Sequence, residues 1–270
     1  MALFAAPAGA SVFGPRAGHS PNADDIRTAY WVAIAVGAVL IVAVHAFLIA
    51  ALVRFRARRG RSPRRFTAGA RAFLRPAVPL VAVAVGLFVF GIVMMTKSRE
   101  VQATGSEGLQ ADSDLLAQVN GLSIAPNAKP LNINVIGQRW LWRFEYPGGQ
   151  PGNRVFSYGT LTVPVDTPVL LHLTSSDVTH RWFIPALGGQ VDALPGQDVG
   201  TWFKADRVGT YHGQSTSFSG TSYAAMRAWV HVVTAQQYQD FINRKRAGLA
   251  RAQKQVAKEL GETTAPGATP

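Results

Sequence analysis

A loop in the last quarter of the chain has the outline of a metal-binding loop but lacks the side chains that bind soft metals. It reads GQSTSFSGTSYAAM from Gly213 to Met226, and most of its polar side chains are hydroxyls. A serine hydroxyl keeps its proton at neutral pH, whereas soft metals are bound by thiolate, thioether and imidazole groups. The chain has no cysteine, which excludes disulfides, iron–sulfur clusters, thiolate zinc sites, ordinary blue copper and a cysteine nucleophile.

The loop lies within a region of short strand-like segments. Between Leu131 and Val233, runs such as LNINVI, WLWRFEY, PVLLHLT and MRAWVHVV are rich in β-branched and aromatic residues and are separated by Gly, Pro, Asp and Ser. About six or more such strands in roughly a hundred residues indicate a β-sandwich or barrel. We assign this domain to residues 130–235, a polar linker to residues 98–129, and a polar C-terminal helix with a disordered tail to residues 236–270.

Two apolar segments precede this domain, at residues 29–53 and 77–96. At about 1.5 Å per residue each is long enough to cross a bilayer core of roughly 30 Å. The loop between them, residues 54–75, carries nine arginines and no acidic residue. Such a loop could bind nucleic acid, but between two spans it fits the positive-inside rule better. We therefore predict a transmembrane hairpin at residues 29–97 in a bacterial cell membrane, with residues 1–28 and the C-terminus on the outer face.

Three ordered stretches of the β-domain carry a resemblance to a known family. They are GQRWLWRFEY (Gly137 to Tyr146), DVTHRWFIPALG with DALPG (Asp177 to Gly196), and the loop from Gly213 to Met226. With the two spans, they resemble subunit II of the haem-copper respiratory oxidases, the cytochrome c oxidase subunit II family, over about residues 25–235. The resemblance implies a two-helix transmembrane hairpin followed by an all-β cupredoxin-like sandwich or barrel, with a C-terminal helix.

In the cytochrome c-oxidising members, two bridging thiolates, two histidines, a methionine and a main-chain carbonyl hold a pair of copper ions. Carried over by that resemblance, the bridging positions are Ser215 and Ser219, and the second histidine position is Tyr223. Ser217 replaces the glutamate that supplies the carbonyl, so that His180 and Met226 alone remain. One imidazole and one thioether do not make a binuclear site, and we expect neither copper nor catalytic residues in this chain.

The serine-rich loop also resembles that of quinol oxidases, whose subunit II has the same fold without copper. The resemblance thus implies a non-catalytic subunit of an oxidoreductase complex, with haems and the oxygen-reducing copper in a large partner subunit I. It also implies a subunit III, the lipid bilayer as a partner, and no nucleic acid. Two alternatives stay open: a cytochrome c oxidase fed by a separate carrier, and a stand-alone membrane-tethered cupredoxin-like binding module. The family's proton-entry motif before the second span is not matched at Ala72 and Arg75.

Five further residues have structural interpretations beside the chemical ones. We predict that His180 is a hydrogen-bonded loop histidine and that Met226 packs in the core. Trp140 is expected to serve packing or subunit contacts, and Asp192 to fix a turn. For His45, in the first span, we predict a hydrogen bond to the neighbouring helix, because ionisable groups in spans face protein or water.

Overall fold

The computed structural model describes residues 14–15, 17–54, 56, 70–109, 122–125, 128–148 and 154–263. The centre of the predicted basic loop, the middle of the predicted linker and the end of the predicted tail lie outside the described residues. The chain forms two compact units: the first contains the described residues among 1–15 and 25–98, and the second contains those among 16–24 and from residue 99 onward.

The first unit is a hairpin of two long apolar helices, α1 (Pro21–Arg54) and α2 (Ala70–Ser98). Both pass a test of length and hydropathy for spanning a membrane. Many of their apolar side chains are exposed: Phe47 is 72% exposed and Phe88 is 69% exposed. Lys97 at the end of α2 pairs with Asp25 near the start of α1 at 2.6 Å, so the helices are antiparallel. Outward-facing apolar surface of this extent is what a lipid environment requires.

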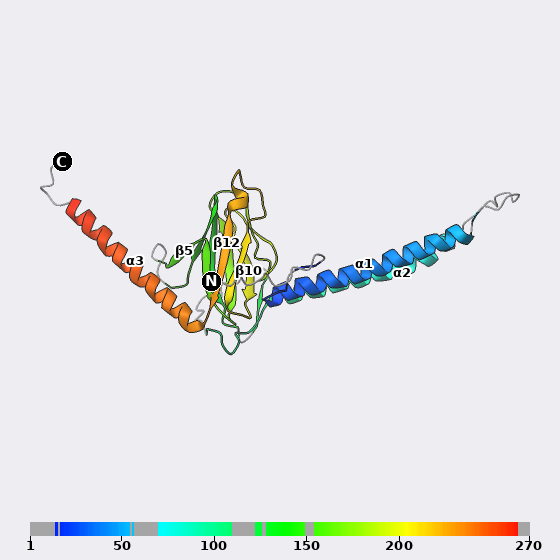
Figure 1. Ribbon diagram of the computed structural model, residues 1–270, viewed down its shortest axis with the longest axis horizontal. Coiled ribbons are helices and arrows are strands. Elements are labelled where there is room, and N and C mark those ends of the chain that lie inside the picture. Colours follow the sequence, from blue (N-terminus) through cyan, green and yellow to red (C-terminus); the bar gives the residue numbers. More distant parts are fainter. Residues whose placement is uncertain are drawn as a thin grey trace, which may run out of the picture. The chain divides into compact units, whose positions relative to one another are not determined.

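The second unit is a β-sandwich, whose strands appear in green to orange in Figure 1. Its larger sheet has the order β10-β7-β3-β4-β5 and its smaller sheet the order β11-β12-β6, while β8 pairs with β9 and β1 with β2. The strands are β1 (Glu100–Val101), β2 (Ser123–Ile124), β3 (Leu131–Gln138), β4 (Leu141–Glu145), β5 (Phe156–Tyr158), β6 (Thr160–Pro164), β7 (Pro168–Ser175), β8 (His180–Trp182), β9 (Val191–Ala193), β10 (Val199–Lys204), β11 (Gly209–Gln214) and β12 (Arg227–Val233).

The sandwich follows from the alternation of apolar residues along the strands. In β3, residues 131, 133, 135 and 137 are buried and the residues between them are half-buried. In β12, Ala228, Val230 and Val232 are buried while the residues between them face outward. Strand side chains alternate between the two faces of a sheet, so each strand offers one face to the core. The core between the sheets includes the fully buried Trp142 and Phe144.

The C-terminal helix α3 (Ala235–Thr263) begins directly after β12. Tyr238 and Ile242 are buried in the β-sandwich core, and Phe241 packs against it. The C-terminal part of the helix extends away from the β-domain, as Figure 1 shows for the orange-to-red ribbon. Near the N-terminal end of the chain, the residues just before α1 also contact this domain: the N–H of His19 donates to the carbonyl of Ala186 at 2.7 Å.

The predicted fold class is confirmed: two apolar helices, an all-β sandwich and a C-terminal helix. The elements differ from the predicted ranges at their ends. Helix α1 begins at Pro21, before the predicted start at residue 29, and the predicted linker contributes the short parallel strands β1 and β2. The predicted partner of His45 is wrong, because its Nδ1 lies 2.7 Å from the carbonyl of Ile41, one turn earlier in the same helix.

Candidate functional site

The serine-rich loop joins the ends of β11 and β12, two antiparallel neighbours in the smaller sheet. Its base is closed by a hydrogen bond of 2.9 Å from the N–H of Ser215 to the carbonyl of Met226. A 3₁₀ turn, η1 (Tyr223–Ala225), returns the chain to β12. Gly220 takes a φ of +111°, which side-chain-bearing residues rarely adopt. The sheet therefore fixes both ends of the loop, and the glycine allows its sharpest bend.

Beneath the loop lies His180, the first residue of β8, which is completely buried. Its Nε2 lies 2.8 Å from Oδ1 of Asp177. Because a carboxylate only accepts, Nε2 carries the proton, and in a neutral imidazole Nδ1 then has a free lone pair. Nδ1 is buried and has no hydrogen-bond partner among the described residues. Gly137 makes room for the ring, since a Cβ there would lie 2.8 Å from Cδ2 of His180.

Asp177 is held as an anion by the groups around it. Burial on its own would raise the pKa of this carboxyl. The hydrogen bond from His180 and those from the N–H groups of Val178 and Arg139 outweigh that effect and lower the pKa to about 2. The two backbone donors lie 2.6 and 2.9 Å from the carboxylate. Asp177 thus orients His180 and also ties together the two chain segments that meet here.

The two serines at the bridging positions are both buried: Ser215 is 1% exposed and Ser219 is 7% exposed. The Oγ of Ser215 accepts a hydrogen bond of 3.2 Å from the N–H of Arg181, the residue after the histidine. The Oγ of Ser219 is buried without a partner among the described residues. The structure therefore joins Ser215 to the segment that carries His180 and buries the hydroxyl of Ser219.

The remaining predicted positions divide between core and surface. Met226 is fully buried and belongs to the hydrophobic core. Ser217 and Tyr223 are only half-buried. The Tyr223 ring lies 5.4 Å from that of Phe218, which is 76% exposed at the tip of the loop. The loop thus places an aromatic pair toward the outside and keeps the methionine inside.

The two tryptophans of the first motif have different surroundings. Trp142 is fully buried and packs edge-on against Trp182, with ring centroids 5.4 Å apart. Trp140 is 37% exposed and its Nε1 donates to the carbonyl of Ser219 at 3.2 Å. Its ring lies over Gly220, where a Cβ would be 3.1 Å from Cζ2. Trp140 therefore closes over the serine-rich loop, a contact that the sequence motif did not reveal.

An ion pair beside the histidine was also missed at the level of sequence. Arg181 donates through Nε and Nη2 to the two carboxylate oxygens of Asp192, at 2.6 and 2.9 Å. The two residues are cross-strand partners in β8 and β9. The hydrogen bond raises the pKa of the guanidinium and lowers that of the carboxyl. The predicted role of Asp192 in a turn is therefore wrong, because the residue lies in a strand and its side chain holds Arg181.

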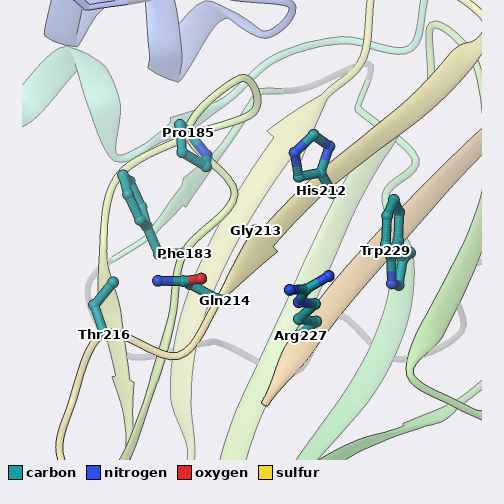
Figure 2. A pocket seen from close by; sticks show the side chains of 8 residues that line it. All are labelled: Phe183, Pro185, His212, Gly213, Gln214, Thr216, Arg227 and Trp229. Carbon is teal, nitrogen blue, oxygen red and sulfur yellow. The ribbon is translucent and has the colours of Figure 1, made fainter. Parts of the chain in front are cut away.

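A cavity of about 570 Å³ opens on the outer face of β11 and β12 (Figure 2). Its floor consists of two cross-strand pairs, His212 with Trp229 and Gln214 with Arg227. Phe183 forms part of the wall, and its carbonyl lies so close to Gly213 that no Cβ would fit there. Among the described residues that line the cavity there is no carboxylate and only one imidazole, so it does not have the ligands of a metal site.

The donors under the loop do not fit a pair of copper ions. They are one imidazole nitrogen, one thioether and two hydroxyls, with no anionic sulfur. Two copper ions that share an electron need polarisable anionic bridges, and a neutral hydroxyl is not one. In the described part of the chain, no three side chains of His, Asp or Glu come together as a metal-binding group. The polar side chains of the loop for which the structure describes partners are engaged in hydrogen bonds.

Known proteins resemble this chain. The family described as "Cytochrome C oxidase subunit II, periplasmic domain" matches residues 154–233. Cytochrome c oxidase subunit 2 of Cereibacter sphaeroides is 25% identical over 86% of this chain and 80% of its own length. Cytochrome bo(3) ubiquinol oxidase subunit 2 of Buchnera aphidicola is 34% identical over 38% of this chain and 35% of its own length. The crystal structure of the periplasmic domain of subunit II of cytochrome oxidase from Bradyrhizobium japonicum is 26% identical, covers 46% of this chain and 98% of that domain, and has a TM-score of 0.42.

Proposed function

Because this chain belongs to the subunit II family of haem-copper oxidases, we propose that it is the copper-free subunit II of a respiratory terminal oxidase that oxidises quinol. In this role the chain has no catalytic residue of its own. Its helices pack against a large haem-bearing subunit I in the cell membrane, together with a subunit III. Its β-domain caps that subunit on the outer face.

One observation carries the proposal. Ser215 and Ser219 are buried where copper-bearing members have bridging thiolates, and the Ser215 hydroxyl is engaged by the N–H of Arg181. The loop is therefore folded and internally hydrogen-bonded with serines, which supports a stable domain that needs no metal. An electron arriving at this domain would find no acceptor, because no group under the loop has an accessible one-electron couple.

The electron donor follows from this chemistry. Soluble cytochrome c needs a relay on the outer face, whereas a quinol dissolved in the bilayer can pass electrons directly to a haem of the large subunit. A domain without a relay therefore fits a quinol donor better. Relatives named ubiquinol and quinol oxidase subunit 2, from Buchnera aphidicola and Bacillus subtilis, match 38% and 53% of this chain.

The placement in the membrane is part of the proposal. The two apolar helices are long enough to span, and nine arginines lie between Arg54 and Arg75. Under the positive-inside rule this loop is cytoplasmic, and both termini and the β-domain lie on the outer face. The chain spans only about a third to four fifths of the length of the relatives that it matches, so subunit composition is proposed here from chemistry and topology.

A second function, a cytochrome c oxidase fed by a separate carrier, is favoured by one comparison. The relative from Cereibacter sphaeroides that matches 86% of this chain is a cytochrome c oxidase subunit 2. His180 and Met226, which would be copper ligands in such a protein, are both retained and buried. In that case another protein would have to deliver electrons past this domain.

Two measurements test the proposal. The chain purified in detergent without its partners is expected to hold no stoichiometric copper and to lack the near-infrared absorption of a mixed-valence copper pair. Oxygen uptake by the complete oxidase is expected with quinol and not with reduced cytochrome c. About two coppers per chain would overturn the copper-free assignment, and oxygen uptake with cytochrome c alone would favour the second function.

A further inference from the structure

A groove of about 300 Å³ lies between α3 and the segment that leads into β5. Three of the side chains that line it are cations: Arg154 from the β-domain, and Arg244 and Lys245 from α3. The remaining lining is apolar or small and includes Val155, Phe156 and Leu249. The groove thus combines a positive rim with an apolar floor, and it lies outside the serine-rich loop.

The positive charge of the groove is not neutralised within the described structure. Glu145 is the one carboxylate that approaches, at 3.7 Å from Arg154. Its closer contact, at 2.8 Å, is with Arg143, so that it is shared by two arginines. Among the described residues, Arg244 has no hydrogen bond or ion pair, and the ammonium of Lys245 only approaches the ring of Phe241, at 5.7 Å. Closely placed cations without counter-charges favour an anionic ligand.

The apolar floor continues along α3 beyond the β-domain. Leu249 is followed on the same helix face by Val256 and Leu260, seven and eleven residues later. Val256 is 54% exposed and Leu260 is 62% exposed. This is the face that places Ile242 in the core, and the helix extends it away from the sandwich (Figure 1). An apolar stripe that begins at a cationic groove offers space for a molecule with an anionic head and a hydrocarbon tail.

We propose that this groove is a binding site for an acidic phospholipid. The phosphate pairs with Arg244, Lys245 and Arg154, and an acyl chain lies along Leu249, Val256 and Leu260. Two observations favour a lipid over an acidic protein segment. The chain carries two helices suited to a membrane, and the apolar extension of the groove is a single stripe of side chains, Leu249, Val256 and Leu260, of the width of one hydrocarbon chain. Arginine and lysine side chains near a bilayer surface favour anionic lipids.

The groove can be altered by charge and by volume. Arg244→Glu/Lys245→Glu reverses the charge of the rim. Arg251→Glu/Lys254→Glu makes the same change in charge further along α3, at two exposed side chains that do not line the groove, and is the matched control. Gly248 also lines the groove, and a Cβ there would meet nothing within 4 Å. A Cβ is therefore accommodated at this position, and Gly248→Leu is expected to occupy space in the groove while leaving its charge unchanged.

The test is native mass spectrometry of the full chain in a neutral detergent, with phosphatidylglycerol and phosphatidylcholine of identical acyl chains as probes. The unaltered chain is expected to retain phosphatidylglycerol at least about tenfold more than phosphatidylcholine. Arg244→Glu/Lys245→Glu and Gly248→Leu are expected to lose this preference, and Arg251→Glu/Lys254→Glu to keep it. The spanning helices are the same in every variant, so their own bound lipids cancel in the comparison.

Three outcomes would overturn the proposal. Equal retention of the two lipids would show that the groove does not recognise the anionic head. If the groove variants and the matched control lost the preference for phosphatidylglycerol equally, the preference would come from the net charge of the chain and not from the groove. Displacement of the lipid by millimolar inorganic phosphate, with no influence of acyl-chain length, would make the groove a free-phosphate site. Circular dichroism of each variant, with unchanged helix content, shows that α3 has stayed folded.

Discussion

The Nε2 of His180 lies 2.8 Å from the carboxylate of Asp177, while Nδ1 of the same ring is buried without a partner among the described residues. The imidazole is therefore oriented by one strong hydrogen bond, and its other nitrogen is shielded from solvent. In a metal-binding relative such an arrangement would orient a ligand. Here it leaves a structural pair whose energetics can be measured.

The Asp177–His180 pair makes the free energy of unfolding of the β-domain depend on pH in the acidic range. The pKa of Asp177 is lowered from an unfolded value of 3.8 to about 2. A carboxyl with a lowered pKa stabilises the fold above its unfolded pKa, and that stability is lost as the pH falls from about 4 to about 2. The full shift would correspond to about 2.5 kcal/mol, and solvent screening at this partly exposed group reduces the expected contribution to about 1 kcal/mol.

The variant Asp177→Asn tests this dependence by guanidinium unfolding followed through tryptophan fluorescence. We expect it to be about 1 kcal/mol less stable than the unaltered chain at pH 7 and equally stable near pH 2. Asp198→Asn is a suitable control, because Asp198 is the more exposed member of a similar pair with His172, at 63%. A constant difference between Asp177→Asn and the unaltered chain at all pH values would contradict the charge-based explanation.

Tyr146 is predicted to contribute through a buried hydrogen bond. Burial raises the pKa of its phenol, and its hydroxyl accepts from the N–H of Thr162 at 2.8 Å. Tyr146→Phe leaves that N–H buried without a partner, and we expect a loss of about 1–3 kcal/mol in the free energy of unfolding. Tyr238→Phe is the matched control, because no hydrogen bond of its hydroxyl is found among the described residues, and it should cost less than about 0.5 kcal/mol. Equal effects of the two variants would refute this assignment.

Much of the fold could be predicted because its signals are local in the sequence. The apolar runs of α1 and α2 and the alternation in β3 are set by periods that the chain shows directly. The ends of elements were less predictable: the start of α1 at Pro21 lies in a polar stretch that packs on the β-domain through His19. Such a contact depends on residues such as Ala186, which are distant in sequence.

The candidate site was predictable in its positions but not in its contacts. The spacing of the motifs identified His180, Ser215 and Met226, and all three are buried in the structure. The ion pair of Arg181 with Asp192 could not be predicted from the sequence, because it depends on the register of β8 against β9. Both strands have three residues, and no hydrophobic pattern aligns them. The hydrogen bond of Trp140 could not be predicted for a similar reason, since its acceptor, the carbonyl of Ser219, lies 79 residues later in the chain.

The contact of Trp140 with Gly220 predicts a specific effect on the loop. Gly220→Ala adds a Cβ at about 3.1 Å from the indole, at a backbone φ of +111°. Since both the backbone and the contact resist a side chain, we expect a loss of about 1–3 kcal/mol in stability and a more exposed Trp140. Iodide quenching of tryptophan fluorescence would report that exposure. Gly248→Ala is the control: this glycine lies in a helix with open space around it, and the substitution should raise the free energy of unfolding by up to about 1 kcal/mol. If Gly220→Ala were also stabilising, a side chain at position 220 would not strain the loop.

Adding two cysteines and a histidine to the loop should allow it to bind copper, if its backbone has the form of a copper site. The variant Ser215→Cys/Ser219→Cys/Tyr223→His adds two thiolates and an imidazole to the buried His180 and Met226. We expect about two coppers per chain and the near-infrared band of a mixed-valence pair, because soft bridging ligands and terminal nitrogens are then present. Ser215→Cys/Ser219→Cys alone lacks the second imidazole and should bind copper more weakly, without the mixed-valence spectrum.

The unaltered chain, treated with the same copper, provides the baseline. If the triple variant folds, as its circular dichroism would show, but binds no more copper than the baseline, then the loop differs from a copper site in its backbone as well as in its side chains, and the serines alone do not explain the absence of the metal.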